Sequence, residues 1–313
     1  MKFIKDITEN ENFKGYYLCK KKEEKKTKNN DSYLDIILID KTDSISSKIW
    51  NLDCIISEFS AGDVVQIEAQ SELYNNKMQL KILRIRKAAK GEYDPKNYIV
   101  SSHRDIIEMK EEFNIIINSI KNINLNQLLN NIFINNPDIM KKFEEHPAAK
   151  SNHHGFFGGL IEHTISVASI CDFLSNRYNG VNRDLLVTAA LLHDIGKLYE
   201  LNSYPEIEYT NKGKLLGHIV IGYELVSKEI GNILNFDSNL KEDLLHCILS
   251  HHGDLEFGSP VVPKTIEAII LSCADRTDAH TKQFEEMIAK IKPEEEWSGY
   301  NYIIKREIKK SII

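Results

Sequence analysis

The feature that most constrains this chain is the stretch LLVTAALLHDIGK, residues 185–197. All but one of its first eight residues are apolar, which predicts a helix buried inside a domain. The helix ends on His193 and Asp194, with Lys197 close behind, and such groups are costly to bury without partners. A histidine, a carboxylate and an amine brought to one buried point indicate a metal site that handles phosphate. The alternative is a core helix closed by Gly196, with a satisfied histidine and a surface lysine.

Length, charge and cysteine pattern limit the class of protein. The 313 residues are enough for two domains, and the net charge of -6 means that any nucleic-acid surface must be local. The five cysteines form no CxxC pair, which favours a reducing cytoplasm over a disulfide framework or a zinc ribbon. The first residues lack the apolar core of a signal peptide, and no stretch approaches the roughly 18 apolar residues of a membrane span. We therefore expect a cytoplasmic protein without membrane contact.

Residues 1–90 predict a small β-barrel. Short alternating or apolar strands are expected at 15–19, 33–40, 45–50, 64–69 and 78–85, and residues 72–74 precede the last of them across a turn at 75–76. Five short strands in so little chain suit a closed barrel. Residues 91–105 mix glycine, proline and serine with charge, and we expect them to form a linker.

The N-terminal half resembles the OB-fold of tRNA anticodon-binding domains. The resemblance rests on DKTD at 40–43, ISSKIW at 45–50, GDVV at 62–65 and YNNKMQLKI at 74–82. OB barrels bind single strands with basic loops and stacking aromatics. The candidates for nucleic-acid contact are Tyr17, Lys48, Trp50, Tyr74, Lys77, Lys81, Arg84 and Arg86. For Tyr17 and Trp50 the alternative is a place in the barrel core or rim.

A lysine-rich run spans residues 20–28. We expect it in the first hairpin loop, where it either tracks phosphates or is simply a solvated loop, because two glutamates interrupt it.

After the linker the pattern becomes helical. Helices are expected at 106–120, 125–133, 136–143, 158–174, 184–195, 216–231, 238–250, 263–279 and 281–291. The sequence therefore predicts an all-α domain over residues 106–313, with a metal-site core at about 150–290.

Potential metal ligands recur along this helical half. They are His163, His193, Asp194, His218, His251, His252 and Asp275. Successive positions are separated by about 24 to 33 residues, one helix-turn-helix period each, so neighbouring helices can bring them to a common centre. Polar ligands on otherwise apolar helix faces are hard to explain as ordinary core residues. The pattern therefore predicts a metal centre.

The order H…HD…H…HH…D resembles the HD superfamily of metal-dependent phosphohydrolases. Together with PAAKSNHH at 147–154, GGLIEH at 158–163 and the OB-like half, the whole chain resembles the YhaM-type 3′→5′ exoribonucleases. That resemblance implies hydrolysis of phosphodiester bonds in single-stranded RNA, with single-stranded DNA as a further substrate. The lysine-rich hairpin departs from the usual pattern.

The resemblance also implies roles for the ligands. His163, His193, Asp194 and Asp275 would hold one metal ion, and Asp194 would bridge to a second held by His218 and His251. This mixture of imidazole and carboxylate ligands suits manganese, iron, cobalt or zinc better than magnesium. We expect two divalent ions, with manganese as the preferred metal. HD enzymes with three metals place an acid four residues before the first histidine; Gly159 stands here, so we expect two at most. The metals would activate a hydroxide for attack on the phosphate.

Further residues are expected around the metals. Asp194, Lys197 and His252 are the candidate catalytic residues, with Lys197 one turn beyond the His-Asp pair and able to reach a phosphate oxygen. The alternative for Lys197 is a helix-terminal cation. Three more residues would contact substrate or orient a ligand, namely His153, His154 and Asp278.

Two other functions remain open. One is an HD phosphohydrolase of small nucleotides, although HIVIGY at 218–223 lacks the Gly-Tyr-Pro signature of cyclic-dinucleotide enzymes. The other is a non-catalytic nucleic-acid-binding regulator, against which the intact ligand set counts. A homo-oligomer is expected because one small barrel gives a short footprint on a strand.

Overall fold

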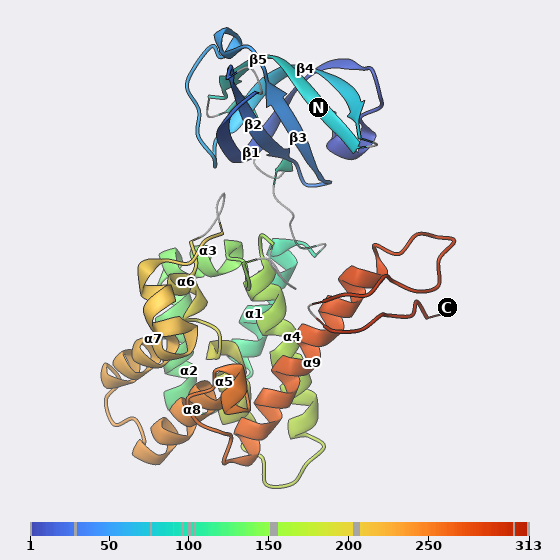
Figure 1. The fold of residues 1–313 in the computed structure, drawn as a ribbon. Coiled ribbons are helices and arrows are strands. Elements are labelled where there is room, and N and C mark those ends of the chain that lie inside the picture. Colours follow the sequence, from blue (N-terminus) through green and yellow to red (C-terminus); the bar gives the residue numbers. More distant parts are fainter. Residues whose placement is uncertain are drawn as a thin grey trace. The chain divides into compact units, whose positions relative to one another are not determined.

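The computed structural model describes residues 2–27, 30–75, 77–89, 91–94, 97–98, 102, 104–150, 156–202, 207–302 and 304–311. The chain divides into two compact units with the boundary between residues 101 and 102. Figure 1 shows a unit of strands and a unit of helices. None of the described helices is long and apolar enough to cross a bilayer.

The first unit is a closed five-stranded barrel. Its strands are β1 (Asn12–Lys26), β2 (Ser32–Ile39), β3 (Ser44–Ile49), β4 (Val64–Tyr74) and β5 (Lys77–Lys87). They are ordered β1-β2-β3-β5-β4, and the long β1 closes the ring by pairing with β4 through its first half and β2 through its second. This OB-like barrel confirms the fold expected of the N-terminal half. Two 3-10 turns, η1 (Ile4–Asp6) and η2 (Leu52–Cys54), accompany it.

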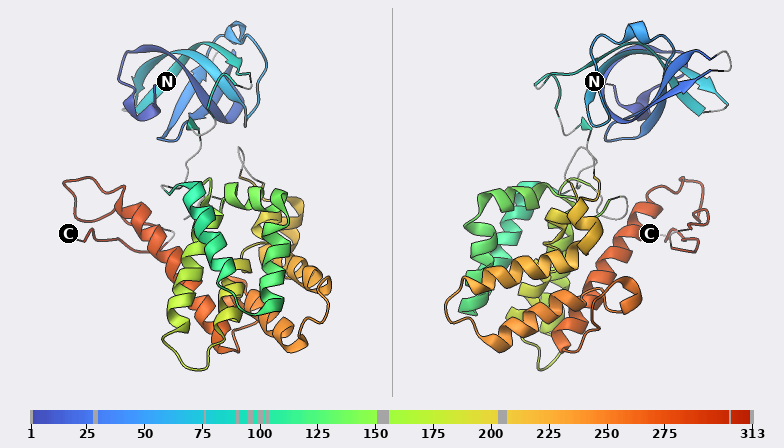
Figure 2. Two further views of the ribbon diagram at one scale, coloured as in Figure 1. Left: turned by 180° about the vertical axis from the view of Figure 1, so that it is seen from behind. Right: turned by 60° about the vertical axis from the view of Figure 1, so that its left-hand side comes forward.

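Strand alternation fills the barrel. Along β2 the side chains of Leu34, Ile36 and Leu38 are buried while their neighbours are only partly covered, as a period of two requires. The parallel pairing of β3 with β5 completes the ring. The right-hand view of Figure 2 looks into this ring.

Two features of this unit differ from the sequence predictions. The lysine-rich run does not form a loop: residues 20–26 belong to β1, and residues 21–26 pair with β2, so the hairpin is longer than its turn residues suggested. The linker also begins later in the chain than residue 91, where the sequence predicted its start. Tyr98 is buried and Tyr93 packs beside it, both against a small apolar cluster on the barrel around Leu18 and Val64. These aromatic contacts hold the first part of the linker on the barrel.

The second unit is all α-helical. Its helices are α1 (Ile106–Asn118), α2 (Ile123–Leu129), α3 (Pro137–Glu145), α4 (Gly159–Ser175), α5 (Arg183–Leu192), α6 (Lys197–Glu200), α7 (Asn211–Gly231), α8 (Ser238–Ser250) and α9 (Ile266–Ile288), with a π-helical turn η4 (Asn130–Ile134) and a 3-10 turn η5 (Leu255–Phe257). The helices predicted at 263–279 and 281–291 are the single helix α9, because a polar stretch on its surface looked like a break.

Short polar side chains fix where most of these helices begin. The N-cap residues Asp105, Asn122, Asn136, Asn182, Thr210, Asp237 and Thr265 each accept a hydrogen bond from a backbone N–H of the first turn. Each such cap stabilises its helix by about 1 kcal/mol.

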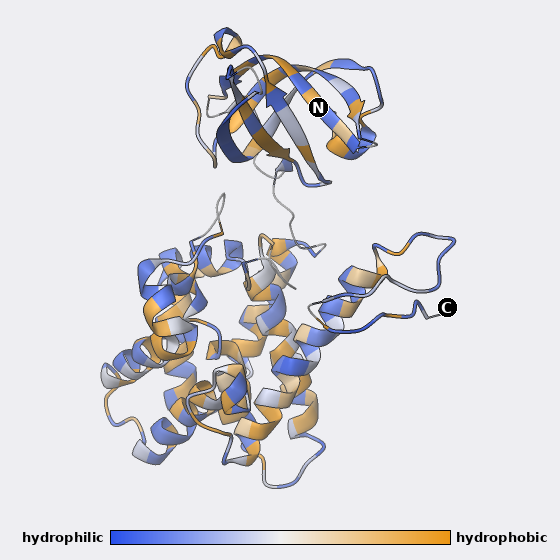
Figure 3. Ribbon diagram, viewed as in Figure 1, coloured by the Kyte–Doolittle hydropathy of each residue, from blue (hydrophilic) through white to orange (hydrophobic). Residues whose placement is uncertain are grey.

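Helix α5 is the centre of the helical unit. Every residue from Leu185 to Leu192 is buried, and α4, α8 and α9 pack around it (Figures 1 and 2). In Figure 3 apolar and polar residues are interleaved along the helices of this unit, and the apolar residues of α5 belong to its buried core. The prediction of a buried helix that ends on a His-Asp pair is therefore confirmed, and the pair is delivered into the core.

Candidate functional site

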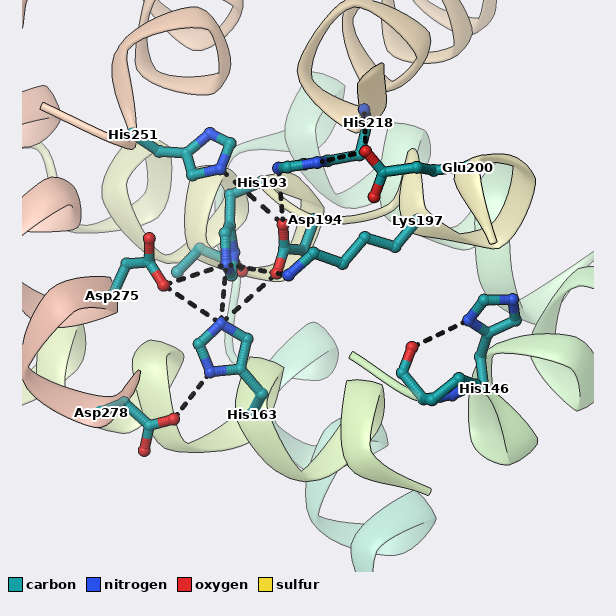
Figure 4. A network of polar contacts seen from close by, with 12 residues as sticks. His146, His163, His193, Asp194, Lys197, Glu200, His218, His251, Asp275 and Asp278 are labelled. Carbon is teal, nitrogen blue, oxygen red and sulfur yellow. Dashed lines mark hydrogen bonds and ion pairs between the residues drawn. The ribbon is translucent and has the colours of Figure 1, made fainter. Parts of the chain in front are cut away.

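Histidines and carboxylates from three helices meet at the end of α5. His193 is the C-cap of α5 and Asp194 follows it, and both are buried. His163 comes from the second turn of α4 and Asp275 from the middle of α9. The Nε2 atom of His163 lies 3.2 Å from that of His193, 3.4 Å from Asp194 Oδ2 and 3.2 Å from Asp275 Oδ1. Figure 4 shows these side chains converging.

The other oxygen of Asp194 faces a second set of side chains. Asp194 Oδ1 lies 3.5 Å from His218 Nε2 and 3.7 Å from His251 Nε2. His252 joins this set, since its ligand atom and those of His218 and His251 lie within 4.8 Å of one another. One carboxylate thus stands between two groups of ligand atoms, as the sequence predicted.

The chemistry of this second group tests whether a cation fits. Asp194 Oδ1, His218 Nε2 and His251 Nε2 are buried and have no hydrogen-bond partner among the described residues. Leaving three such atoms unsatisfied would cost several kcal/mol. Because all three are potential ligand atoms aimed at one another, a divalent cation among them would satisfy the whole group. The residues present therefore fit a metal ion.

Asp194 and His251 have the protonation states that cation binding requires. Burial would raise the pKa of Asp194, but Lys197 and His193 outweigh it and hold that pKa well below its usual value. Burial, with His193 and His252 nearby, lowers the pKa of His251 well below normal. An ionised carboxylate and a neutral imidazole are the forms that ligate metals.

Each inward-facing imidazole is held from behind. His193 and His251 place Nδ1 2.7 Å from the backbone oxygens of Ala190 and Ile248. His163 Nδ1 lies 2.7 Å from Asp278 Oδ2, the position that a residue orienting this ligand would take. Such partners fix the ring orientation and leave Nε2 for the metal.

Glu200 holds His218 and was missed by the sequence analysis. Its Oε1 accepts hydrogen bonds from the backbone N–H of His218 and from His218 Nδ1, both at 3.0 Å. Burial would raise the pKa of Glu200, but His218 outweighs it and the pKa is lowered. The signal was weak, because an acid at the end of a four-residue helix looks like a surface residue.

Gly196 and Gly217 shape the backbone between the two sets. Gly217 has φ +70 and kinks α7 one residue before His218. Gly196 does not close α5 with a left-handed turn, since its φ is -62. Its role is close contact: a Cβ here would lie 2.0 Å from the backbone oxygen of His218. The prediction of Gly196 as a helix stop is therefore corrected to a packing role against α7.

Comparison with known proteins agrees with this centre. The HD domain family matches residues 160–295, which include all the proposed ligands. The 3′-5′ exoribonuclease YhaM of Geobacillus sp. (strain WCH70) is 34% identical over 269 residues, covering 85% of this chain and 82% of the relative. The YhaM proteins of Listeria monocytogenes serotype 4b (strain CLIP80459) and Listeria welshimeri serovar 6b are each 33% identical over 269 residues, covering 85% of both chains. The chain belongs to the YhaM 3′-5′ exoribonuclease family.

Among solved structures, the second OB-fold domain of replication protein A from Methanococcus maripaludis is similar to this YhaM-family chain. It shares 18% sequence identity with a TM-score of 0.23, and the match covers 29% of this chain and 96% of that domain.

Lys197, a predicted catalytic residue of this YhaM-family chain, lies at the centre. It begins α6, and its Nζ donates to Asp194 Oδ2 at 2.5 Å. Burial would lower the pKa of Lys197, but Asp194 outweighs it and raises that pKa, which keeps the ammonium charged. The contact places the ammonium beside the ligand set, and the catalytic role of Lys197 stays a prediction beside the alternative of a helix-terminal cation.

His153 and His154 cannot be placed in the same way. Both were predicted to contact substrate or to orient a ligand from the loop before α4, and both lie outside the described residues. The roles of His153 and His154 stay predictions.

One predicted nucleic-acid contact of the barrel is wrong. Tyr17 is fully buried, and its hydroxyl donates to the backbone oxygen of Lys2 at 2.7 Å. A Cβ at Gly15 would lie 2.7 Å from this ring, so glycine makes room for it. Tyr17 is a core residue of the barrel and cannot stack on a base.

The other barrel candidates lie on or near the surface. Trp50 is 47% exposed and stacks on Tyr33, with ring centroids 4.7 Å apart. Lys48 forms an ion pair with Asp35 and is opposite Lys81 in the β3–β5 pairing. The exposed residues Tyr74, Lys77 and Arg84 follow along β4 and β5, whereas Arg86 is held by Glu92.

Tyr33 was missed by the sequence analysis. It lies on β2 in the same cross-strand row as Lys25 of β1. Its aromatic character was visible, but its pairing with Trp50 depends on the β2–β3 register.

Proposed function

We propose that this chain is a metal-dependent 3′-5′ exoribonuclease that hydrolyses single-stranded RNA one phosphodiester bond at a time. The observation that carries the proposal is the convergence of Asp194 Oδ1, His218 Nε2 and His251 Nε2, buried and unpartnered among the described residues. Activity on RNA is what the names of the relatives state for those proteins.

The ligand assignment uses both oxygens of Asp194. His163, His193, Asp194 and Asp275 would hold one ion. His218 and His251 would hold a second with Asp194, and we add His252 because its ring nitrogen belongs to the same group. Two bound divalent ions supply positive charge that acidifies a water molecule and offsets the charge of the phosphate. The mixture of imidazole and carboxylate ligands supports manganese as the bound metal, with iron, cobalt, zinc or magnesium as alternatives.

The protein's own groups do the rest of the work. Lys197 holds its ammonium against Asp194 and can neutralise a non-bridging phosphate oxygen beside it. Asp278 and Glu200 keep the imidazoles of His163 and His218 turned inward. Burial of the ligand set at the end of α5 limits water around the reacting phosphate.

The barrel would hold the strand. The Tyr33–Trp50 pair offers an aromatic surface, and Lys48 and Lys81 bring cations to neighbouring strands. Base stacking tolerates any sequence, because every base has a π-face, and it does not depend on the 2′-hydroxyl. For that reason we include single-stranded DNA as a second substrate.

Compartment and assembly are part of the proposal. All five cysteines are free thiols, which supports a reducing cytoplasm. A homo-oligomer stays a prediction, to be tested by sedimentation of the purified chain.

The test incubates the full chain with Mn²⁺ and a 5′-labelled oligoribonucleotide, beside a panel of free nucleotides. We expect a ladder shortened from the 3′ end, and loss of the ladder in Asp275→Asn but not in Asp243→Asn, which changes an exposed acid. Turnover of free nucleotides alone would favour a small-nucleotide phosphohydrolase, and binding without turnover would favour a regulator.

A further inference from the structure

The chain continues past α9 as a short two-stranded ribbon. An isolated bridge joins Trp297 to Lys309, and a second joins Asn301 to Arg306. Between them, the backbone N–H of Ser298 donates to the oxygen of Ile308 at 2.8 Å. Figures 1 and 2 show this segment leaving the end of α9 and standing away from the helical body.

The ribbon has its own anchor. Ile308 is only 2% exposed, and Ile291, just after α9, is also buried. The N–H of Lys310 donates to the backbone oxygen of Glu296 at 2.8 Å. A segment with a buried residue and cross-strand hydrogen bonds has a defined face, so the exposure of its other side chains is a structural property.

Large aromatic side chains lie on the outside of the ribbon. Trp297 and Tyr300 are each 52% exposed, and Tyr302 is 86% exposed. The rings of Tyr300 and Tyr302 are 5.2 Å apart and nearly perpendicular. Three exposed aromatics in six residues are unusual for a surface, since burial of such rings is strongly favourable.

Cations alternate with these rings. Lys305, Arg306 and Lys309 are exposed, and Lys309 lies over the Trp297 ring at 5.8 Å. From residue 297 to 311 the only carboxylate is Glu307, whereas the acidic run 294–296 lies at the base of the ribbon. The outer part of the ribbon is therefore basic, although the chain as a whole carries a net charge of -6.

We propose that this ribbon, residues 297–302 and 304–310, is a second binding surface for single-stranded RNA, separate from the barrel and from the metal centre. Exposed rings interleaved with cations are the combination that binds single strands without sequence preference. The inference rests on the proposed exoribonuclease function for the identity of the strand. Charge complementarity favours a polyanion over a second copy of this acidic chain.

Helix α9 gives the ribbon a specific place on the substrate. The helix carries Asp275 in its middle and ends at Ile288. Thirteen residues of helix rise about 20 Å, so the ribbon stands well away from the metal centre along one rigid element. A strand whose 3′ end lies in the centre would reach the ribbon several nucleotides upstream. The ribbon should therefore matter for long substrates and not for dinucleotides.

The test measures RNA binding with the full chain in a chelator, where no cleavage occurs. The aromatic variant is Tyr300→Ala/Tyr302→Ala, and the charge variant is Arg306→Gln/Lys309→Gln; both leave Ile308 in place. The control, Lys228→Gln/Lys264→Gln, removes two cations from helix α7 and from the turn before α9. The probes are an oligoribonucleotide of about 20 nucleotides, longer than the roughly 4–16 that one OB barrel covers, and a dinucleotide.

We expect the aromatic variant to bind the long RNA about five-fold or more weakly. In the charge variant, the slope of log affinity against log salt should shrink by about 1.4, the value for two phosphates of a single strand. With metal added, KM for the long substrate should rise while kcat and dinucleotide cleavage stay unchanged. Unfolding curves that match the wild type would show that the variants are folded.

Several outcomes would overturn the proposal. One is equal binding of long RNA by the ribbon variants and the control. Another is a ribbon that instead governs binding to vesicles containing phosphatidylserine, or self-association in sedimentation, with RNA affinity unchanged. A chain that binds RNA through the ribbon in chelator but never cleaves RNA with metal would refute the proposed function and leave the ribbon surface standing.

Discussion

The barrel and the helical unit differ in whether a buried carboxylate has hydrogen-bond partners for both of its oxygens. In the barrel, Asp40 is buried and both of its carboxylate oxygens accept hydrogen bonds. Oδ2 accepts one from the backbone N–H of Ile4 at 2.6 Å, and Oδ1 accepts one from the backbone N–H of Thr42 at 2.7 Å. In the helical unit, Asp194 is equally buried, yet its Oδ1 has no hydrogen-bond partner among the described residues. A satisfied buried charge holds a fold together, whereas an unsatisfied one indicates a missing ligand.

Histidine placement repeats the contrast. Residues 1–101 contain no histidine, and all 11 histidines of the chain belong to the helical unit. We therefore expect metal binding to be confined to the helical unit, and strand binding to be shared with the barrel.

The largest effect is expected for Asp194→Ala. Loss of the carboxylate shared by both ligand groups should reduce RNA cleavage by at least about 10³-fold. Strand binding should stay largely intact, because the barrel is untouched. Gel-shift and cleavage assays measure the two properties, and Asp194→Asn, which keeps the side-chain volume, guards against misfolding. If binding is lost together with cleavage, the division of labour between the units is wrong.

Tyr17→Ala should act on the barrel alone. Removing a fully buried aromatic ring costs about 3–5 kcal/mol. The chain has only two tryptophans, Trp50 in the barrel and Trp297 in the ribbon, so fluorescence of Trp50 in a Trp297→Phe background reports barrel unfolding. Tyr74→Ala removes an exposed ring and should change stability by less than about 0.5 kcal/mol. Equal destabilisation by both variants would contradict the core position of Tyr17.

His146 should make the helical unit sensitive to acid. Burial lowers the pKa of His146 to about 4, from 6.5. The unfolded chain then takes up a proton more readily than the folded chain. Stability from the neutral ring is fully present above pH 6.5 and falls by about 3 kcal/mol as the pH drops to 4. Denaturant unfolding at several pH values measures the slope, which should become shallower in His146→Asn. In His280→Asn, which changes an exposed histidine, the slope should match the wild type.

Glu200→Gln should weaken metal binding rather than strand binding. Without the carboxylate behind His218, affinity for one of the two ions should fall about 10- to 100-fold. Titration calorimetry with Mn²⁺ would show one weakened site and one unchanged site. Glu224→Gln, which alters an exposed acid, is the control. Equal weakening of both sites would mean that Glu200 acts through the fold of α6 and not through His218.

Trp50→Ala should act on strand binding and not on metal binding. Loss of one stacking ring should weaken binding of single strands by about 1–3 kcal/mol, and raise KM with kcat unchanged. Manganese binding should match that of the wild type. A variant that loses metal affinity would show that the two units are coupled more closely than their separate cores suggest.

The sequence was most informative about residues whose side-chain chemistry and spacing along the chain indicate the same site. The convergence of the candidate ligands from His163 to Asp275 could be predicted because polar ligand residues recur about one helix-turn-helix period apart on otherwise apolar helices. It was least informative where the role of a residue depends on which distant segments of the chain pack against it. For Tyr17 the sequence left both a stacking role and a core position open, and only the closed barrel decides between them, because it buries the ring completely. Glu200 is buried only because the α7 segment folds over it: a Cβ at Gly213 would lie 2.1 Å from the Glu200 backbone oxygen.

The contact at Gly196 has a consequence for how this centre can change. A methyl group at this position would meet the carbonyl of His218 at 2.0 Å and the amide of Gly222 at 2.7 Å. Main chain lies directly against main chain there, so the position of His218 relative to Asp194 depends on the absence of a side chain at Gly196. Any mutation that adds even one carbon would push α7 outward and pull the imidazole of His218 away from Asp194. Substitution of Gly196 by any other residue is therefore excluded, however freely the surface residues around it vary.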